Sequence, residues 1–553
     1  MLTNFLVNSW LKAGDVPGEQ GNECPRTASP TASFTESDPK NTKSDKRERL
    51  QNCVTTAFGI TVGPRPTPNS CHYKINVGGK LFEDPDFEMS SLKDRFPKLE
   101  FKRPPEICQD PKFFIKGRSS KPSGKSQIGD AWFLPAVTLV ASRPDLIEKV
   151  FDVNQSFEKE KYTGMFKFKF WLYGEWVNIV VDDRLPVNGK NLMFCGVNDE
   201  GFWMALLEKA YAKLIGSYDA ITCVGYPFSL LCLTGGIIDT VHKSEFEADE
   251  YEKLAQETAT GVLILALTSY DLPLGGINGL LPNQAHALTG LIEVKTSNNT
   301  TIQLVKLCSP WNTVKWTGKW CGSKTTWAEI NASDKERLIK EKTENEYWMD
   351  WTEFVKLFER LSKCYVTPNA LIECVEKVPP TQKESTSIPV QHHWRRKTSG
   401  GAPGTDRNRF QRNPQFVVNV SYMNEGEKGK IPVIYNLLLK YGEKTSRRCI
   451  ASGIVVYKMP DEESGRFRRF DANFFNDPTN QPVYTQKVFK YCGSAGYLKL
   501  DPGAYVFVAS SFVPEDHGTF FLRIVAQGKL LVSLASQCDS TISFLFASTT
   551  RDY

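Results

Sequence analysis

Apolar residues in the first half of the chain recur mainly with the period of a helix. One such stripe is formed by Phe202, Trp203, Leu206, Leu207, Ala210, Tyr211 and Leu214. This spacing predicts a helix that packs its apolar side inward. Before it, apolar and basic residues alternate over 166–170, and Tyr173–Trp176 supplies a turn into the apolar run Val177–Val181. That pattern predicts a β-hairpin, so residues 131–219 are expected to be helix-rich with one hairpin.

The next part of the chain is patterned as short strands. Val262–Thr268, His286–Val294 and Thr301–Cys308 are apolar or alternating runs separated by Gly, Asn and Pro, which is typical of strands and turns. Trp351–Cys364 is expected to be a helix that closes this unit. The apolar segment Tyr226–Leu233 is interpreted as a loop. A helix-rich half is therefore followed by a β-rich half.

Residues from Trp394 onward alternate between short apolar runs and turn residues. The expected strands are Gln415–Tyr422, Val433–Leu439, Ile454–Tyr457, Tyr505–Ser510 and Thr519–Ala526. Regular short strands with turn signals between them indicate a β-sandwich, here of about eight strands.

These patterns divide the chain into successive units. The expected ranges are a disordered leader (1–75), a two-part core (76–375, split into 76–240 and 241–375), a Pro-, Ser- and Thr-rich linker (376–392) and a β-sandwich (393–553). A length of 553 residues is too great for one hydrophobic core. The predicted fold class is α+β, followed by an all-β domain.

Composition narrows the class of protein. The hydrophobic fraction of 41% suits a globular chain, and the net charge of +5 is too small to favour a nucleic-acid partner. The 14 cysteines are scattered without metal-ligand spacing, which is typical of reduced intracellular thiols. No signal peptide or apolar run long enough to span a bilayer is found in the sequence. A cytoplasmic protein is expected.

Residues 129–134 read Gly-Asp-Ala-Trp-Phe-Leu. This resembles the Gly-Asp-Cys-Trp-(Phe/Leu)-Leu signature of the calpain family of papain-like cysteine proteases, with Ala131 at the nucleophile position. Other segments resemble the same family in collinear order: Phe82–Phe87, Lys102–Ile107, Trp394–Gly401, Asn413–Phe416 and Pro502–Val506. The last three resemble the calpain-type, C2-like β-sandwich. The resemblance covers about residues 80–550.

The resemblance implies a catalytic site whose members have changed. Such a protease needs a thiolate at a helix N-terminus, a histidine to exchange its proton, a third residue to orient that histidine and an oxyanion donor. His286, in Ala-His-Ala-Leu-Thr-Gly, matches the general-base position and is retained. Ser309 replaces the orienting Asn, and Lys125 stands where the oxyanion Gln is expected. Together with Ala131, these changes imply a pseudoprotease.

Two alternatives to a natural pseudoprotease stay open. Cys308 is the thiol that could act as a displaced nucleophile, although it lies on the wrong wall of the expected cleft. An engineered Cys-to-Ala form of an active enzyme would change one residue, whereas Lys125, Ala131 and Ser309 depart together. Trp132 and Trp311 are implied to line the cleft in either case.

Active calpains, which this chain resembles, bind calcium in the protease core through several oxygen ligands. Glu208, Glu344 and Glu346 match ligand positions, whereas Pro122, Lys315 and Gly322 replace acidic partners. Calcium is therefore expected to bind weakly or to be unnecessary. Candidate acidic loop residues in the sandwich are Glu425, Glu427, Asp461, Glu462 and Glu463, and no EF-hand loop is found in the sequence.

The expected function is that of an intracellular polypeptide-binding or regulatory pseudoprotease. Its partners would be extended polypeptides, including active calpains or their substrates, and no nucleic acid. One alternative is a calcium-dependent cysteine endopeptidase. Another is a protein whose β-sandwich carries the binding, to other proteins or to a membrane surface.

Overall fold

The computed structural model describes most of the chain from residue 80 onward. The described ranges run over 80–535 and 548–549, with gaps at 88, 90–91, 94–95, 116–132, 190, 195–200, 222–225, 297, 310–315, 322–324, 343–344, 377–384, 405–406, 441–449, 461–467, 487–489 and 491–492. All of these residues belong to one compact unit, Val54–Tyr553. The expected leader lies outside the described residues. Among the helices that are described, none is long and apolar enough to cross a membrane.

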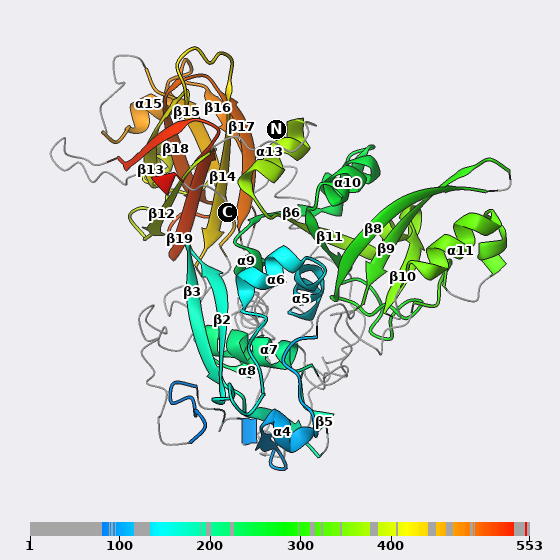
Figure 1. The fold of residues 1–553 in the computed structure, drawn as a ribbon. Helices are drawn as coiled ribbons and strands as arrows, with labels where there is room; N and C mark the ends of the chain where they lie inside the picture. Colours follow the sequence, from blue (N-terminus) through cyan, green and yellow to red (C-terminus); the bar gives the residue numbers. More distant parts are fainter. Residues whose placement is uncertain are drawn as a thin grey trace, which may run out of the picture. The chain divides into compact units, whose positions relative to one another are not determined.

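The first half of the core combines helices with one long hairpin (Figure 1). Its helices are α4 (Pro104–Ile107), α5 (Leu134–Ala141), α6 (Pro144–Val150), α7 (Trp203–Ile215), α8 (Tyr218–Ile221) and α9 (Tyr226–Thr234). Its strands are β1 (Glu100–Lys102), β2 (Met165–Leu172), β3 (Glu175–Asp182), β4 (Leu185–Asn188) and β5 (Asn191–Leu192). Strands β2 and β3 form the predicted hairpin, which turns at Tyr173 (φ 45°) and Gly174 (φ 112°).

Helix α7 is buried on every side and not only along its apolar stripe. Glu208, Lys209 and Lys213 are 1%, 0% and 8% exposed. Lys213 Nζ lies 2.8 Å from both carboxylate oxygens of Asp84, and Lys209 Nζ lies 2.6 Å from Asp182 Oδ1. The backbone amide of Asp84 also donates to Asp182. Asp84, Asp182, Lys209 and Lys213 are called the buried ion cluster below.

The second half of the core is built on one antiparallel sheet in the order β10-β9-β8-β7-β11-β6. The strands are β6 (Ile237–His242), β7 (Leu263–Thr268), β8 (Ala285–Lys295), β9 (Thr301–Cys308), β10 (Glu346–Asp350) and β11 (Phe358–Tyr365). The helical elements are α10 (Glu250–Ala259), α11 (Ala332–Lys340), α12 (Trp351–Leu357) and α13 (Pro368–Glu376), with short 3-10 turns at Lys243–Glu245 and Thr325–Ala328. The three strands predicted in this half are confirmed.

Two predictions for the core are wrong. The helix expected over Trp351–Cys364 ends at Leu357, and the chain continues as β11 between β7 and β6. Pairing on both sides of this strand outweighs its local helical spacing. The segment Tyr226–Leu233, interpreted as a loop, is helix α9, and Leu230, Leu231 and Leu233 are buried in it.

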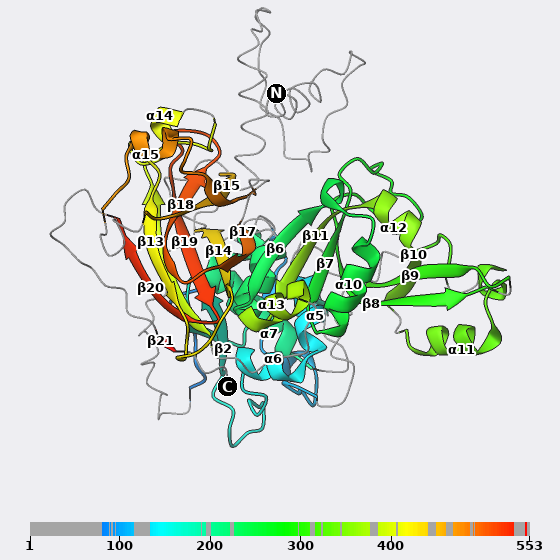
Figure 2. The same cartoon turned by 90° about the horizontal axis from the view of Figure 1, so that it is seen from above.

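The C-terminal part is a sandwich of two five-stranded sheets, ordered β17-β14-β19-β12-β21 and β16-β15-β18-β13-β20. The strands are β12 (Thr386–Trp394), β13 (Gln415–Ser421), β14 (Ile431–Leu439), β15 (Ser452–Lys458), β16 (Pro482–Thr485), β17 (Ser494–Leu500), β18 (Gly503–Ser511), β19 (Gly518–Ala526), β20 (Lys529–Leu534) and β21 (Ser548–Thr549). Helices α14 (Arg407–Phe410) and α15 (Ala472–Asn476) lie together at one end of it (Figure 2).

The α+β fold class is therefore confirmed, and so are the five strands predicted within the sandwich, to within two residues at each end. The sandwich has more strands than the eight expected, since β12, β16, β17, β20 and β21 carry weaker patterns. Strand β12 begins at Thr386, inside the range expected to be a linker.

Candidate functional site

The sheet of the second half brings His286 and Ser309 to the same end. His286 is the second residue of β8, and Ser309 follows the last residue of β9. Ala287 pairs with Cys308 in the antiparallel register, so the next position places Ser309 opposite His286. The amide of Ser309 donates to the carbonyl of Asn345, just before β10. The sequence predicted both residues, and the fold makes them neighbours.

His286 is enclosed by aromatic side chains. It is 0% exposed, and its Nδ1 lies 3.0 Å from the hydroxyl oxygen of Tyr347 on β10. The rings of Tyr347 and Phe358 stand edge-on to the imidazole, with centroids 6.0 and 5.6 Å away. The ring of Trp316 stacks on the ring of Tyr347. We call His286, Ser309, Tyr347 and Phe358 the histidine site.

The histidine site holds an uncharged imidazole. Burial lowers the pKa of His286 to about 3, because the aromatic surroundings do not solvate a positive charge. Burial also raises the pKa of Tyr347 well above its usual value, so its hydroxyl stays protonated and available for the hydrogen bond. Nε2 of His286 has no hydrogen-bond partner among the residues that the structure describes. A base with so low a pKa holds no proton near neutral pH and takes one up only with difficulty.

The thiol of Cys308 is close in register to the histidine site but is sealed from solvent. Cys308 is 1% exposed, is not in a disulfide, and pairs through its backbone with Ala287 on one side and Glu346 on the other. A nucleophile must reach a substrate carbonyl from an accessible position. In this conformation the Cys308 side chain has no such access.

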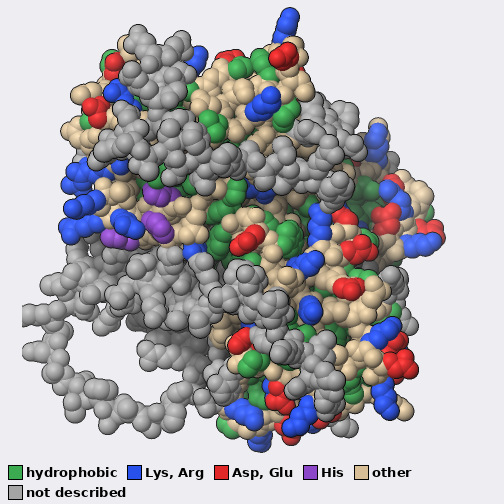
Figure 3. Space-filling model, turned by 60° about the vertical axis from the view of Figure 1, so that its left-hand side comes forward, with side chains coloured by type: hydrophobic (Ala, Val, Ile, Leu, Met, Phe, Trp, Pro, Cys, Tyr) green, Lys and Arg blue, Asp and Glu red, His purple; other side chains and the backbone are tan. Residues whose placement is uncertain are grey.

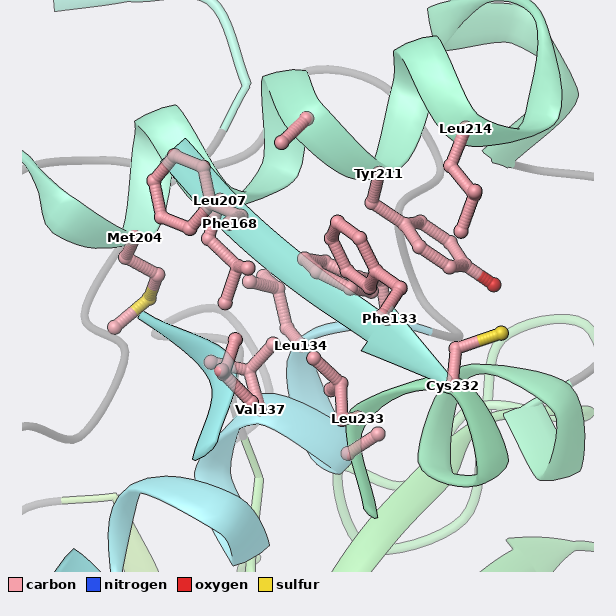
Figure 4. Close-up of a cluster of buried hydrophobic side chains, with 14 of the residues drawn as sticks. Phe133, Leu134, Val137, Phe168, Met204, Leu207, Tyr211, Leu214, Cys232 and Leu233 are labelled. Carbon is pink, nitrogen blue, oxygen red and sulfur yellow. The ribbon is translucent and has the colours of Figure 1, made fainter. Parts of the chain in front are cut away.

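The nucleophile position is described only through its neighbours. Lys125, Ala131, Trp132, Trp311 and Glu344 lie outside the described residues. Phe133, two residues after Ala131, caps the N-terminus of α5 and is 0% exposed. Its ring stacks on Tyr211 of α7 with centroids 4.5 Å apart, inside the apolar cluster drawn in Figure 4. The sequence thus places Ala131 just before a firmly packed helix start, where the family motif requires its nucleophile.

The calcium-ligand positions that are described lie on separate elements. Glu208 is on α7 and Glu346 is on β10, 1% and 3% exposed respectively. Over the described ranges, no three His, Cys, Asp or Glu side chains come close enough to hold a metal ion. The positions Pro122, Lys315, Gly322 and Glu344 lie outside the described residues, so weak or unnecessary calcium binding stays a prediction.

Tyr347 and Phe358 are the members of the histidine site that the sequence analysis did not predict, and Tyr347 is the one that bonds the imidazole. The segment Glu346–Asp350 is short, apolar and flanked by acidic residues, so it gives no periodic signal of its own. Its pairing with β9 places the phenol beside His286, and this is a long-range contact. The only local hint is that a buried tyrosine usually finds a hydrogen-bond partner.

Comparison with known proteins gives a family match for the protease-like core and another for the β-sandwich. Residues 82–365 match the family model described as calpain family cysteine protease. Residues 390–525 match the model described as calpain large subunit, domain III.

Individual relatives agree with these matches. The chain is 31% identical to human calpain-2 catalytic subunit over 475 residues, which cover 82% of this chain and 66% of that protein. It is 33% identical to human calpain-14 over 476 residues, covering 83% of this chain and 68% of the relative. Rat calpain-8 is 31% identical over 481 residues, with 82% and 66% covered. The chain thus spans about two thirds of the length of these relatives, and with a protease-core match and a domain III match in the same order, it belongs to the calpain family.

Proposed function

We propose that this calpain-family chain binds polypeptides without cleaving them, as a pseudoprotease that needs no calcium. The observation that carries the proposal is alanine at position 131, inside an otherwise intact signature. A methyl group cannot attack a carbonyl. Removing a protease nucleophile typically costs on the order of 10⁶-fold in turnover.

The histidine site supports the same proposal independently. A thiol is activated when a nearby imidazole accepts its proton and keeps the positive charge. The low pKa of His286, set by burial, opposes that charge. Nδ1 is already used by Tyr347, so one of the two ring nitrogens serves the packing of the sheet. With Ser309 in place of the orienting Asn, and Lys125 in place of the oxyanion Gln, the supporting groups have changed along with the nucleophile.

Binding without cleavage would use the surface that the family uses for substrates. Trp132 and Trp311 are retained in the motifs that flank the cleft in this family. An extended polypeptide can be held there by backbone pairing and by apolar side-chain contacts, with no chemical step. The partners would be extended segments of intracellular proteins, including those that active calpains cleave, or active calpains themselves.

The test measures cleavage and binding on the same full-length protein. Turnover of casein and binding of a labelled, calpain-cleavable peptide are measured with calcium and with a chelator, for the natural chain, Ala131→Cys and the matched control Ala131→Ser. We expect no turnover by the natural chain or Ala131→Ser, and peptide binding in both conditions. If Ala131→Cys cleaves the peptide, the cleft still positions substrates. If it does not, the histidine site has also lost its catalytic properties.

Two outcomes would contradict the proposal. Turnover by the natural chain that a thiol-directed electrophile abolishes would establish the alternative, a cysteine endopeptidase using a displaced thiol such as Cys308. Failure of the natural chain to bind any extended peptide would remove the binding role.

A further inference from the structure

The sheet of the second half has two faces, and α5 packs on one of them. Ala285 and Ala287 of β8 lie in the same buried cluster as Val137 of α5. Cys308, which pairs with Ala287, belongs to that cluster too. Side chains alternate between the two faces along a strand, and β8 pairs with β7 without a shift of register here. The residue between the two alanines, His286, therefore points to the other face.

The contacts of His286 agree with this alternation. A second buried cluster lies on its face of the sheet and contains Leu288, Leu307, Tyr347 and Phe358. The rings of Tyr347 and Phe358 are the ones that stand edge-on to the imidazole. His286 thus lies on the face of the sheet opposite to α5, and α5 is the helix that begins just after the altered nucleophile position.

Full enclosure sets His286 apart from the other histidines that the structure describes. His242, His392, His393 and His517 are partly or fully exposed. Figure 3 shows histidine side chains at the surface, beside those of Lys and Arg. Proton transfer needs two groups within hydrogen-bond reach, about 2.6–3.2 Å, directly or through one water. The sheet itself lies between the imidazole of His286 and α5, so this condition is not met.

The hydrogen bond of His286 connects two strands that are not neighbours. β9 lies between β8 and β10 in the sheet, so the 3.0 Å bond from the Tyr347 hydroxyl to His286 Nδ1 crosses β9. Leu307 of β9 pairs with Tyr347. Ser309 follows directly after β9, and its amide donates to the carbonyl of Asn345, just before β10. The bond therefore ties β8 to β10 at the place where the chain leaves β9.

We propose that His286 is a positioning residue for polypeptide binding and takes no part in proton transfer, an inference that rests on the proposed binding function. Through Tyr347 it holds the ends of β8, β9 and β10 together and so fixes the direction in which the chain leaves β9 at Ser309. Trp311 follows two residues later, in the motif that flanks the cleft in this family. An uncharged imidazole suits this role, because it remains a hydrogen-bond partner in surroundings that do not solvate a charge.

The first test asks whether His286 acts on position 131. In the full-length chain, the thiol of Ala131→Cys is alkylated with iodoacetamide at pH values from about 5 to about 10, and mass spectrometry follows the peptide that contains residue 131. The double variants A131C/H286N and A131C/H286L are treated in the same way. We expect all three thiols to show the same apparent pKa, because the imidazole lies across the sheet from α5. A shift of about one pKa unit or more in either double variant would overturn the proposal.

The second test asks whether His286 positions the binding surface. Fluorescence anisotropy measures the affinity of the labelled, calpain-cleavable peptide for the natural chain, His286→Leu and His286→Asn. Asn places an amide group close to where Nδ1 of the ring lies and keeps a partner for Tyr347, whereas Leu supplies only volume. We expect His286→Leu to weaken binding about tenfold and His286→Asn to bind within about twofold of the natural chain. The matched control His517→Leu changes an exposed histidine and should leave the affinity as it is.

The outcomes separate this inference from the proposed function. If the natural chain binds the peptide and His286→Leu binds it equally well, or if His286→Asn binds as weakly as His286→Leu, the positioning role is wrong and the binding function stands. If the natural chain binds no peptide, both are wrong. Circular dichroism gives the folded fraction of each variant, so that a loss of affinity is not confused with a loss of folded protein. Should His286→Leu fail to fold, weak binding by a folded His286→Asn would still overturn the proposal.

Discussion

The buried ion cluster and the histidine site solve the same problem in opposite ways. Both place ionisable groups where water does not reach. In the ion cluster, Lys213 faces Asp84 and Lys209 faces Asp182, so each charge has a partner. In the histidine site, aromatic rings surround the imidazole, and its lowered pKa keeps it uncharged near neutral pH. The comparison shows that this fold keeps buried charge where it fastens chain segments together, and not where the family's chemistry would require it.

The directions in which the pKa values shift show how the ion cluster and the histidine site differ. Burial alone would raise the pKa of Asp182, but Lys209 and Arg184 outweigh burial and hold it well below its usual range. Burial raises the pKa of Asp84, because its main partner, Lys213, only partly offsets the loss of solvent. Burial lowers the pKa of His286, and no charged partner opposes it. Charged partners thus decide how far burial shifts each pKa: they reverse its effect at Asp182, reduce it at Asp84 and do not oppose it at His286.

The largest expected effect comes from breaking the ion cluster. Lys213→Met would leave the Asp84 carboxylate buried without its cation. Removing one partner of a buried pair typically costs about 3–5 kcal/mol. Urea denaturation of the full chain should show this loss in free energy of unfolding, while Lys161→Met, at an exposed position, should change it by less than about 1 kcal/mol. Equal effects in the two variants would mean that the cluster contributes no more than surface charge.

Acidification should act on the histidine site with a graded effect, which for each pH unit is smaller than the loss expected from Lys213→Met. The pKa of His286 is about 3 in the folded chain, against 6.5 as the ordinary value. Between these values the unfolded chain binds the extra proton, so stability is lost as the pH falls from about 6.5 toward about 3, by at most about 1.4 kcal/mol per pH unit. His286→Gln should flatten the pH dependence of urea denaturation over this range. The comparison variant His517→Gln changes an exposed histidine and should leave the slope as it is in the natural chain.

The smallest effect is expected from the phenol. Tyr347→Phe removes the partner of His286 Nδ1 and leaves a buried polar nitrogen behind, which costs about 1–3 kcal/mol. The matched variant Tyr422→Phe removes a hydroxyl that bonds a carbonyl at the surface, and it should cost less. If both variants are equally stable, the hydrogen bond does not hold the imidazole in place. An Nδ1-protonation signal in ¹⁵N NMR that is unchanged by Tyr347→Phe would argue the same.

Much of the fold was readable from the chain because local pattern and tertiary packing agree there. The stripe on α7, the hairpin at Tyr173–Gly174 and strand β9 all follow their periodicity. The helix expected over Trp351–Cys364 shows where they disagree. The side chain of Asp350 accepts a hydrogen bond from the amide of Thr352 and caps the N-terminus of α12. From Phe358 onward, however, the residues pair with β7 in the sheet. The local spacing of apolar residues cannot reveal that β7 and β6 lie on either side of this segment.

The sequence predicts some residues of the candidate site but not their environment. The motif around position 131 and the Ala-His-Ala segment predict Ala131 and His286 as site positions, and of these two the structure describes His286. The neutral state of His286 depends on Tyr347 and Phe358, which come from β10 and β11. The enclosure of the imidazole depends on the order of the strands in the sheet, and the local sequence of a single segment does not determine that order.

The pairing of Lys213 with Asp84 also limits where the chain can be trimmed. Asp84 belongs to the segment 80–87, whose Phe82 amide donates to Thr163 and whose Phe82 carbonyl accepts from Arg103. A protease that cuts ahead of residue 80 leaves all of these bonds intact. A cut a few residues later removes the counter-ion of a lysine at the centre of the core, and the remaining fragment becomes a substrate for degradation. The Lys213–Asp84 pair thus sets a limit beyond which amino-terminal cleavage destabilises the core.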